Sequence, residues 1–257
     1  MLHPRIIPCL LISDNGLVKT KQFKEKKYVG DPINAIRIFN EKKSDELIVL
    51  DIDATTKEIK IDLEKIKKFA AECRMPLCYG GGIKTVEQAK SIISLGVEKV
   101  AISSIAIEDQ SIIEEMAREI GSQSVVVVLD VKKNMFGKYT IFTHNGTKKT
   151  GIELKEMIEI VQKSGAGEVV INSIQNDGMM EGYDLQLAKS LKDMISIPLT
   201  IIGGAGSYDD LRNLISSCGI VGAAAGSLFV FKGIYRAVLI NYPDQNLKKS
   251  ILNLNYE

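Results

Sequence analysis

The sequence contains no tryptophan and only two histidines, four cysteines and six prolines, and its 33 basic and 32 acidic residues leave a net charge of +1. With almost no excess charge, the chain has no global electrostatic attraction for nucleic acid or an anionic membrane, so any anion must be recognised locally. The cysteines lack both Cys-x-x-Cys spacing and nearby histidines, so we expect reduced packing residues, no metal site and no cofactor.

Long apolar runs are also missing. No window approaches the roughly eighteen consecutive apolar residues of a membrane span, and the start of the chain shows no small-residue cleavage site. These absences predict a cytoplasmic protein that does not enter the membrane. The histidines add no candidate for catalysis, because His3 precedes the first predicted strand and His144 lies beside Asn145-Gly146, which is a hairpin signal.

What the sequence has instead is a pair of glycine-rich stretches, Cys78–Ile83 and Ile201–Gly206, each between an apolar run and a helical pattern. Their first glycines are 123 residues apart, and the same offset separates Ser103-Ser104 from Gly226-Ser227. Glycines that end a strand before a helix let backbone N–H groups approach an anion. Either stretch alone would fit a tight turn, but two in register favour phosphate binding.

Apolar β-type segments alternate with helical patterns along the chain. The strands we predict are Ile6–Leu11, Leu47–Asp53, Leu77–Tyr79, Val97–Ile102, Ser124–Asp130, Glu168–Ser173, Leu199–Ile202 and Ile220–Ala225. Helical patterns lie near residues 31–42, 58–73, 85–95, 109–119, 152–164, 185–194, 208–218 and 231–240. Several strands are apolar on both faces, as parallel strands covered by helices must be.

Eight such units in about 250 residues predict the α/β class and a single (β/α)8 TIM barrel with a two-fold internal repeat. A doubly wound open sheet is the alternative, although it usually carries one dominant glycine fingerprint. The predicted single domain, residues 1–257, divides into half-barrels of about 1–123 and 124–240, followed by a tail over 241–257. The longest irregular pieces, Ser13–Asp31 and Lys132–Thr150, follow strands one and five and so correspond between the halves.

In such a barrel the chemistry gathers at the C-terminal ends of the strands. The polar residues expected there are Asp51, Asp53, Ser103, Ser104, Asp130, Asn172 through Asp177, and Ser227. Two glycine cradles on one rim imply a ligand with two phosphates, or an elongated one.

Over essentially its whole length the chain resembles the cyclase subunit of imidazole glycerol phosphate synthase, the HisF family. The matching motifs are Arg5-Ile6-Ile7 with Cys9-Leu10, Gly30-Asp31-Pro32, Asp45-Glu46-Leu47, Gly80–Ile83, Gly121-Ser122-Gln123, Gly165–Glu168, Asp177-Gly178 with Gly182-Tyr183-Asp184, and Gly203–Gly206. The resemblance implies two phosphate sites, one near Gly81, Gly82, Ser103 and Ser104 and one near Asp177, Gly178, Gly203, Gly204, Gly226 and Ser227.

The resemblance also implies that ammonia enters through the barrel from a separate glutaminase subunit, which docks at the N-terminal ends of the strands and forms a heterodimer with the barrel. The family's charged gate at that end is retained as Arg5, Glu46, Lys99 and Glu168. Two acids and two bases that converge at a barrel end also suit simple structural closure, because such a ring pairs its own charges.

Family chemistry uses two facing carboxylates, at the ends of strands one and five, to divide the acid and base roles. Asp130 occupies the strand-five position, but the strand-one position is Leu11. We name Asp130 as the proton-transfer residue, with Asp53 and Lys19 as helpers. Asp53 is the candidate to replace the missing acid, since it lies two residues after Asp51 and faces the same side of the strand; it also suits a helix-start acid.

The loop around Lys19, in which Thr20 replaces a common glycine, resembles the branch of the family attached to cell-surface polysaccharide synthesis. Members of that branch work with a glutaminase and an ATP-dependent amidotransferase to convert an N-acetyl group of a nucleotide-linked sugar into an acetamidino group. This is the function we predict. The alternatives are the histidine-pathway cyclase subunit, acting on a phosphorylated substrate, and a non-catalytic ammonia conduit that activates the glutaminase.

Overall fold

Eight parallel strands close into a barrel in the computed structural model, which describes residues 3–252. In order around the barrel they are β1 (Arg5–Ser13), β4 (Leu47–Asp51), β5 (Leu77–Gly80), β6 (Lys99–Ile102), β7 (Val125–Lys133), β10 (Glu168–Ser173), β11 (Leu199–Ile202) and β12 (Gly222–Ala225). Pairing of β12 with β1 and of β7 with β10 closes the ring. The predicted TIM barrel is confirmed.

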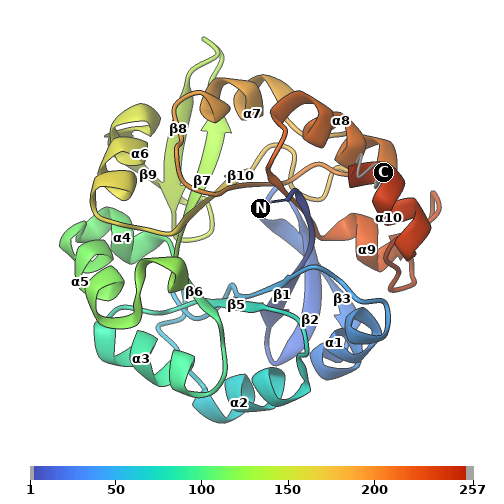
Figure 1. The fold of residues 1–257 in the computed structure, drawn as a ribbon, viewed down its shortest axis with the longest axis horizontal. Coiled ribbons are helices and arrows are strands. Elements are labelled where there is room, and N and C mark those ends of the chain that lie inside the picture. Colours follow the sequence, from blue (N-terminus) through green and yellow to red (C-terminus); the bar gives the residue numbers. More distant parts are fainter. Residues whose placement is uncertain (1–2, 253–257) are drawn as a thin grey trace.

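Helices surround this barrel on its outside (Figure 1). They are α1 (Pro32–Glu41), α2 (Leu63–Glu72), α3 (Val86–Ser94), α4 (Ser104–Glu108), α5 (Ser111–Ile120), the 3-10 helix η1 (Ser122–Ser124), α6 (Leu154–Lys163), α7 (Leu185–Lys192), α8 (Tyr208–Cys218), α9 (Ser227–Val230) and α10 (Gln245–Leu252). Side-chain caps start several of them. Thr85 and Ser207 form capping boxes at α3 and α8, and Asp31 caps α1 ahead of Pro32, whose missing N–H is not needed there.

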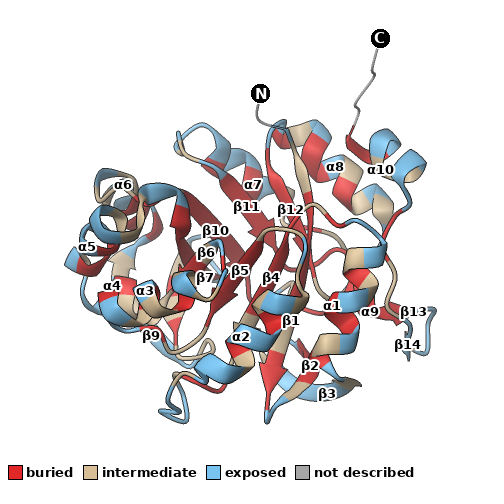
Figure 2. Cartoon of the chain, turned by 60° about the horizontal axis from the view of Figure 1, so that its bottom comes forward, coloured by how far each residue is buried: buried red, intermediate tan, exposed pale blue. Residues whose placement is uncertain are grey.

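The barrel strands are buried over most of their length (Figure 2) because both of their faces are covered. One face packs under the helices, and the other points into the barrel, where side chains two residues apart share the interior. Along β10 the inward series runs from Glu168 through Val170 to Asn172. A small apolar cluster fills the middle of the barrel and comprises Ile7, Cys9, Ile48, Cys78, Ala101, Val126, Val128, Val170, Ile202 and Ala224.

Two sequence predictions about loops were wrong. The pieces Ser13–Asp31 and Lys132–Thr150 are not irregular but form antiparallel extensions of the barrel strands. The first contains β2 (Gly16–Lys21) and β3 (Lys24–Gly30), and the second contains β8 (Tyr139–Thr143) and β9 (Lys148–Glu153). The outer strands β3 and β9 are mostly polar and exposed, so hydrophobic alternation does not reveal these hairpins.

The helix predicted near residues 231–240 is also wrong, because that segment is a short hairpin of β13 (Phe231–Lys232) and β14 (Ala237–Val238). Its apolar residues recur at helical spacing, yet Ile234 and Tyr235 are 89% and 88% exposed. Gly233 and Arg236 have positive φ angles of 72° and 48°, which reverse the chain instead of continuing a helix.

The C-terminal segment that contains Tyr242 and α10 is anchored on the first barrel strand. Tyr242 is 4% exposed and packs against Phe39 and Phe229, with ring centroids 6.4 and 5.4 Å away. Its hydroxyl donates to the carbonyl of Ile6 at 2.9 Å, and the N–H of Ile6 donates to Asp45 at 2.9 Å. The described part of the tail, residues 241–252, is therefore part of the packed fold. Among the described residues, no helix is both long and apolar enough to cross a membrane.

Replacing Tyr242 by alanine should lower the free energy of unfolding by about 3–5 kcal/mol, because a buried ring and its hydrogen bond are both lost. Tyr235→Ala is the matched control. The same truncation at this exposed position should change stability by no more than about 0.5 kcal/mol. Urea unfolding followed by circular dichroism measures both values, and equal effects would contradict the anchoring role of the tail.

Candidate active site

A deep cavity opens at the C-terminal ends of the barrel strands and encloses about 1610 Å³, open solvent included. Its walls come from all eight barrel strands or the loops after them. Of the predicted catalytic and phosphate-binding residues, all but Asp53 line it, namely Lys19, Gly81, Gly82, Ser103, Ser104, Asp130, Asp177, Gly178, Gly203, Gly204, Gly226 and Ser227. The closed barrel thus brings together residues from both halves of the sequence.

Asp130 lies in this cavity on β7, and its carboxylate accepts a hydrogen bond of 3.0 Å from the side-chain amide of Asn172. Burial raises its pKa to about 7, and the nearby charge of Asp177 adds to the rise. A carboxyl group with this pKa exists in both protonation states near neutral pH. Asp130 can therefore accept or donate a proton, which suits general acid and base chemistry.

Lys19 lies on β2 of the first hairpin and Asp177 in the loop after β10, and both line the cavity. The ammonium of Lys19 donates to the carbonyl of Cys9, and its burial lowers its pKa. Asp177 accepts a bond of 2.7 Å from the hydroxyl of Thr20, while burial raises its pKa. Thr20, which departs from the family's usual glycine, thus holds Asp177 in place. Gly226 leaves room for this lysine, because a Cβ there would lie 2.6 Å from its nitrogen.

Leu11 lies in the wall of the same cavity, at the end of β1. An apolar side chain therefore occupies the position where the resemblance to the HisF family predicts a second acid. Asp51, at the end of β4, also lines the cavity and accepts from the backbone N–H groups of Asp53 and Ala54, each at 3.1 Å. Burial raises the pKa of Asp51. The acids that do line the cavity are therefore Asp51, Asp130 and Asp177, together with Glu58 and Glu108 nearer the rim.

Asp53 points away from the cavity into a cluster of its own. Its carboxylate pairs with Lys26 at 2.7 Å and Lys57 at 3.0 Å and accepts from the hydroxyl of Ser13 at 2.7 Å. The burial of Asp53 opposes ionisation, but these bonds outweigh it and hold its pKa well below the ordinary value. A carboxylate that stays ionised and occupied by two lysines fastens the first hairpin to the barrel. This geometry argues against Asp53 as the replacement acid.

The glycines of the two predicted phosphate cradles lie where side chains do not fit. Gly178 has a φ of 68°, and a Cβ there would lie 2.0 Å from the carbonyl oxygen of Thr20. Gly204 has a φ of 115°, and its Cβ would meet the carbonyl oxygen of Gly182 at the same distance. The short helices α4 and α9 begin at Ser104 and Ser227, each without a side-chain cap. Backbone N–H groups are thus left to face the cavity, an arrangement that suits anions.

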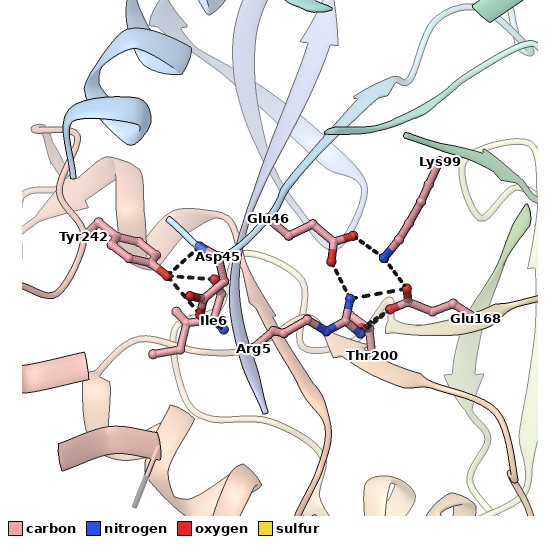
Figure 3. A network of polar contacts seen from close by, with 8 residues as sticks. All are labelled: Arg5, Ile6, Asp45, Glu46, Lys99, Glu168, Thr200 and Tyr242. Atoms are coloured by element: carbon pink, nitrogen blue, oxygen red, sulfur yellow. Dashed lines mark hydrogen bonds and ion pairs between the residues drawn. The ribbon is translucent and has the colours of Figure 1, made fainter. Parts of the chain in front are cut away.

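The four gate residues meet at the opposite end of the barrel (Figure 3). Arg5 pairs with Glu46 and, at 2.8 Å, with Glu168, while Lys99 lies 2.9 Å from both carboxylates. Glu46 and Glu168 are each 3% exposed. Burial favours the neutral form of Glu168, but Arg5 and Lys99 outweigh this effect and lower its pKa. Each of the four charges is paired within the network. The sequence-predicted gate residues are therefore in mutual contact.

Two further residues, Asn172 and His144, line the cavity but are not among the predicted site residues. Asn172 was placed only among polar strand ends, yet its amide bonds Asp130 and its 8% exposure makes it part of the interior. The sequence predicts no catalytic part for His144, which lies in the cavity wall, with Nε2 3.9 Å from Glu108. The usable signal for Asn172 was its position two residues after Val170, on the inward face of β10.

A family model described as "Histidine biosynthesis protein" matches residues 5–235. The chain therefore belongs to that family of barrel proteins. A Vibrio vulnificus protein, provisionally named imidazole glycerol phosphate synthase subunit hisF3, is 56% identical over 255 residues, which cover 99% of this chain and 98% of the relative. A Pseudomonas aeruginosa protein, provisionally named subunit hisF2, is 50% identical over 96% of this chain and 98% of its own length.

An Alkaliphilus metalliredigens protein named imidazole glycerol phosphate synthase subunit HisF, without that reservation, is 38% identical over 91% of this chain and 93% of the relative. Within the histidine biosynthesis family, the chain is thus a HisF-type barrel, similar over nearly its whole length to subunits of this synthase.

Replacing Asp53 by asparagine should lower the free energy of unfolding at pH 7 by about 2–4 kcal/mol, because two lysines lose a buried partner. Since its pKa is depressed in the folded state, the stabilisation is present above the unfolded pKa and is lost as the pH falls through the folded value. Asp14→Asn is the control, because Asp14 pairs with the same Lys57 but its side chain is 79% exposed. In urea unfolding, Asp14→Asn should lower the free energy of unfolding by less than about 1 kcal/mol. Equal losses of stability in the two variants would argue against the buried cluster around Asp53.

Asp130 should give the opposite pH dependence. Its folded pKa of about 7 exceeds that of the unfolded chain, so between about pH 4 and pH 7 the folded state holds the extra proton and loses stability as the pH rises. Asp130→Asn removes this titration, and the variant should gain about 1–3 kcal/mol relative to the natural protein between pH 4 and pH 8. Urea unfolding across this range measures the difference, and a difference that does not change with pH would contradict the shifted pKa.

Proposed function

We propose that this chain is the ammonia-accepting, cyclase-type subunit of an assembly of the imidazole glycerol phosphate synthase kind. The observation that carries the proposal is the combination of HisF family membership with one cavity that holds Asp130, Lys19, Asp177 and two glycine cradles. The partner is a glutaminase subunit of the HisH type, bound as a heterodimer at the end where the gate residues lie. The substrate of the barrel subunit itself carries two anionic groups, one for each glycine cradle. We place the complex in the cytoplasm.

The interior of the barrel supports a route for ammonia between the two ends. Above the gate lies the small apolar cluster, in which Cys9, Cys78, Ala101 and Ala224 have short side chains. Neutral ammonia can cross such a lining, whereas ammonium and other cations pay the cost of leaving water. The gate must open for this passage, because its four charges pair with one another across the entrance.

Two reactions are candidates for the cavity. The names of the relatives favour the first, which is formation of imidazole glycerol phosphate in histidine biosynthesis. Asp130 would exchange protons during ring closure, and the two cradles would hold the two phosphates. The raised pKa of Asp130 supports this role, since its ordinary value would leave it a weak base.

One specific observation favours the second candidate, which is the conversion of an N-acetyl group of a nucleotide-linked sugar to acetamidino for a surface glycan. Leu11 leaves the cavity without a carboxyl group at the strand-one position, and Asp53 is bound to lysines elsewhere. Amidine formation consumes ammonia but closes no ring, so it does not need the same acid–base pair. An ATP-dependent amidotransferase would then be a further partner, and the barrel would act on the sugar or deliver ammonia to that partner.

Complementation of a histidine auxotroph that lacks its cyclase subunit separates these reactions. If this chain and its glutaminase restore growth without histidine, the first candidate stands and the second fails. If they do not, Leu11→Asp should restore growth, because a positioned acid or base contributes about 10²–10⁴-fold to turnover. Leu11→Asn matches the shape of the aspartate without its proton chemistry and should fail to restore growth.

Assays on the reconstituted complex of this chain and its glutaminase test the core of the proposal, which is proton transfer by Asp130. Asp130→Asn keeps the bond to Asn172 but cannot take up a proton, so product formation by the reconstituted complex should fall by at least about 10²-fold. Glutaminase stimulation should persist, since it depends on the opposite end of the barrel. Unchanged product formation would make the barrel a conduit, and absence of any glutaminase binding would overturn the proposal.

A further inference from the structure

Asn172 carries a buried oxygen that has no hydrogen-bond partner among the described residues. The residue is 8% exposed and lies at the C-terminal end of β10, where it lines the cavity. Its strand neighbours are Asp130 on β7 and Ile202 on β11. A buried acceptor without a partner is costly, and such groups in folded proteins are usually met by water or a ligand.

The orientation of this side chain follows from its other end. Its amide nitrogen donates to Oδ1 of Asp130 at 3.0 Å. The reverse orientation would place the amide oxygen against a carboxylate oxygen, which is unfavourable whenever Asp130 is ionised. The oxygen without a partner is therefore the amide oxygen of Asn172, which lies beside Gly203, where a Cβ would be 3.2 Å from it.

The position of Asn172 along β10 indicates which kind of ligand can reach its side-chain oxygen. The inward residues of β10 are Glu168 at the gate, Val170 in the apolar cluster and then Asn172. Anything that passes from the gate along this strand reaches an unoccupied acceptor only after the apolar lining. The ligand must be small enough for that interior and must have an N–H or O–H group to donate.

We propose that Asn172 is the positioning residue for ammonia, which it holds through its side-chain oxygen beside Asp130 at the exit of the barrel interior. One N–H of ammonia donates to Asn172, a second faces the carboxylate of Asp130, and the lone pair is left free. As the lone pair forms a bond to an electrophilic carbonyl carbon of the substrate, the π electrons of that group move to its oxygen. The nitrogen then gives one proton to Asp130.

This inference rests on the proposed delivery of ammonia, so its first test does not need a substrate or a partner. The side-chain amide signal of Asn172 is identified in ¹⁵N–¹H spectra of the whole chain by its loss in Asn172→Leu. Ammonium chloride is then added at pH 8.5 and compared with potassium chloride, because potassium is of similar size but has no N–H group. We expect a saturable shift with ammonium only. Equal shifts with both salts, or none, would overturn the proposal.

The second test uses the reconstituted complex with ammonium as the nitrogen source. Asn172→Leu should raise the KM for ammonium about tenfold, as expected for one lost hydrogen bond, and leave the KM for the phosphorylated substrate unchanged. Asn172→Thr, which restores an oxygen acceptor, should recover much of the loss. Work at pH 8.5, above the pKa of Asp130, limits any effect of the lost amide bond on its protonation.

A merely structural role would change both Michaelis constants or lower stability, and it would not be rescued by threonine. An unchanged KM for ammonium in Asn172→Leu would refute the positioning role. If the complex forms no product from either candidate substrate, the proposed function fails, whereas the spectroscopic titration still decides the role of Asn172.

Discussion

The alternation of side chains along a closed parallel barrel is the constraint on which the rest of this structure depends. Because inward positions recur every second residue, each strand contributes inward side chains at successive levels of the interior. At the bottom, these positions hold two acids and two bases that pair with one another. The middle layers are apolar, and the top layer contains Asp130 and Asn172. A closed entrance, an apolar interior and a polar site thus follow one another along the same axis.

Burial then determines the chemistry of the upper layer. The carboxyl groups of Asp51, Asp130 and Asp177 lie in the cavity with raised pKa values, and Lys19 among them has a lowered one. Such opposed shifts bring acids and a base towards neutrality, where protons can be exchanged. Asp53 is also an aspartate and lies only two positions after Asp51, but two lysines hold it ionised. Its role is to secure the first hairpin.

The departures from the family pattern lie around that hairpin and the end of β1. Leu11 makes part of the cavity wall apolar, whereas Thr20 adds a hydroxyl that holds Asp177. Relatives named as second and third copies of the subunit are 50% and 56% identical to this chain, compared with 38% for one named simply HisF. The charged residues at the barrel entrance and the glycines around the cavity lie where the family resemblance predicts them.

The sequence by itself determined the barrel, since strands such as Glu168–Ser173 and Leu199–Ile202 have matching bounds, and local apolar runs and helix caps dictate them. It also located the glycines, because glycine clusters are local features, whereas the four charged residues of the barrel entrance were predicted from the family resemblance. It could not determine the two long hairpins, whose outer strands β3 and β9 are polar and exposed and lack a periodic signal, or the hairpin at Phe231–Val238, whose spacing is helical. Only the tertiary structure decided that Asp53 is tied to lysines and that Asn172 bonds Asp130, because burial and pairing depend on residues distant in the chain.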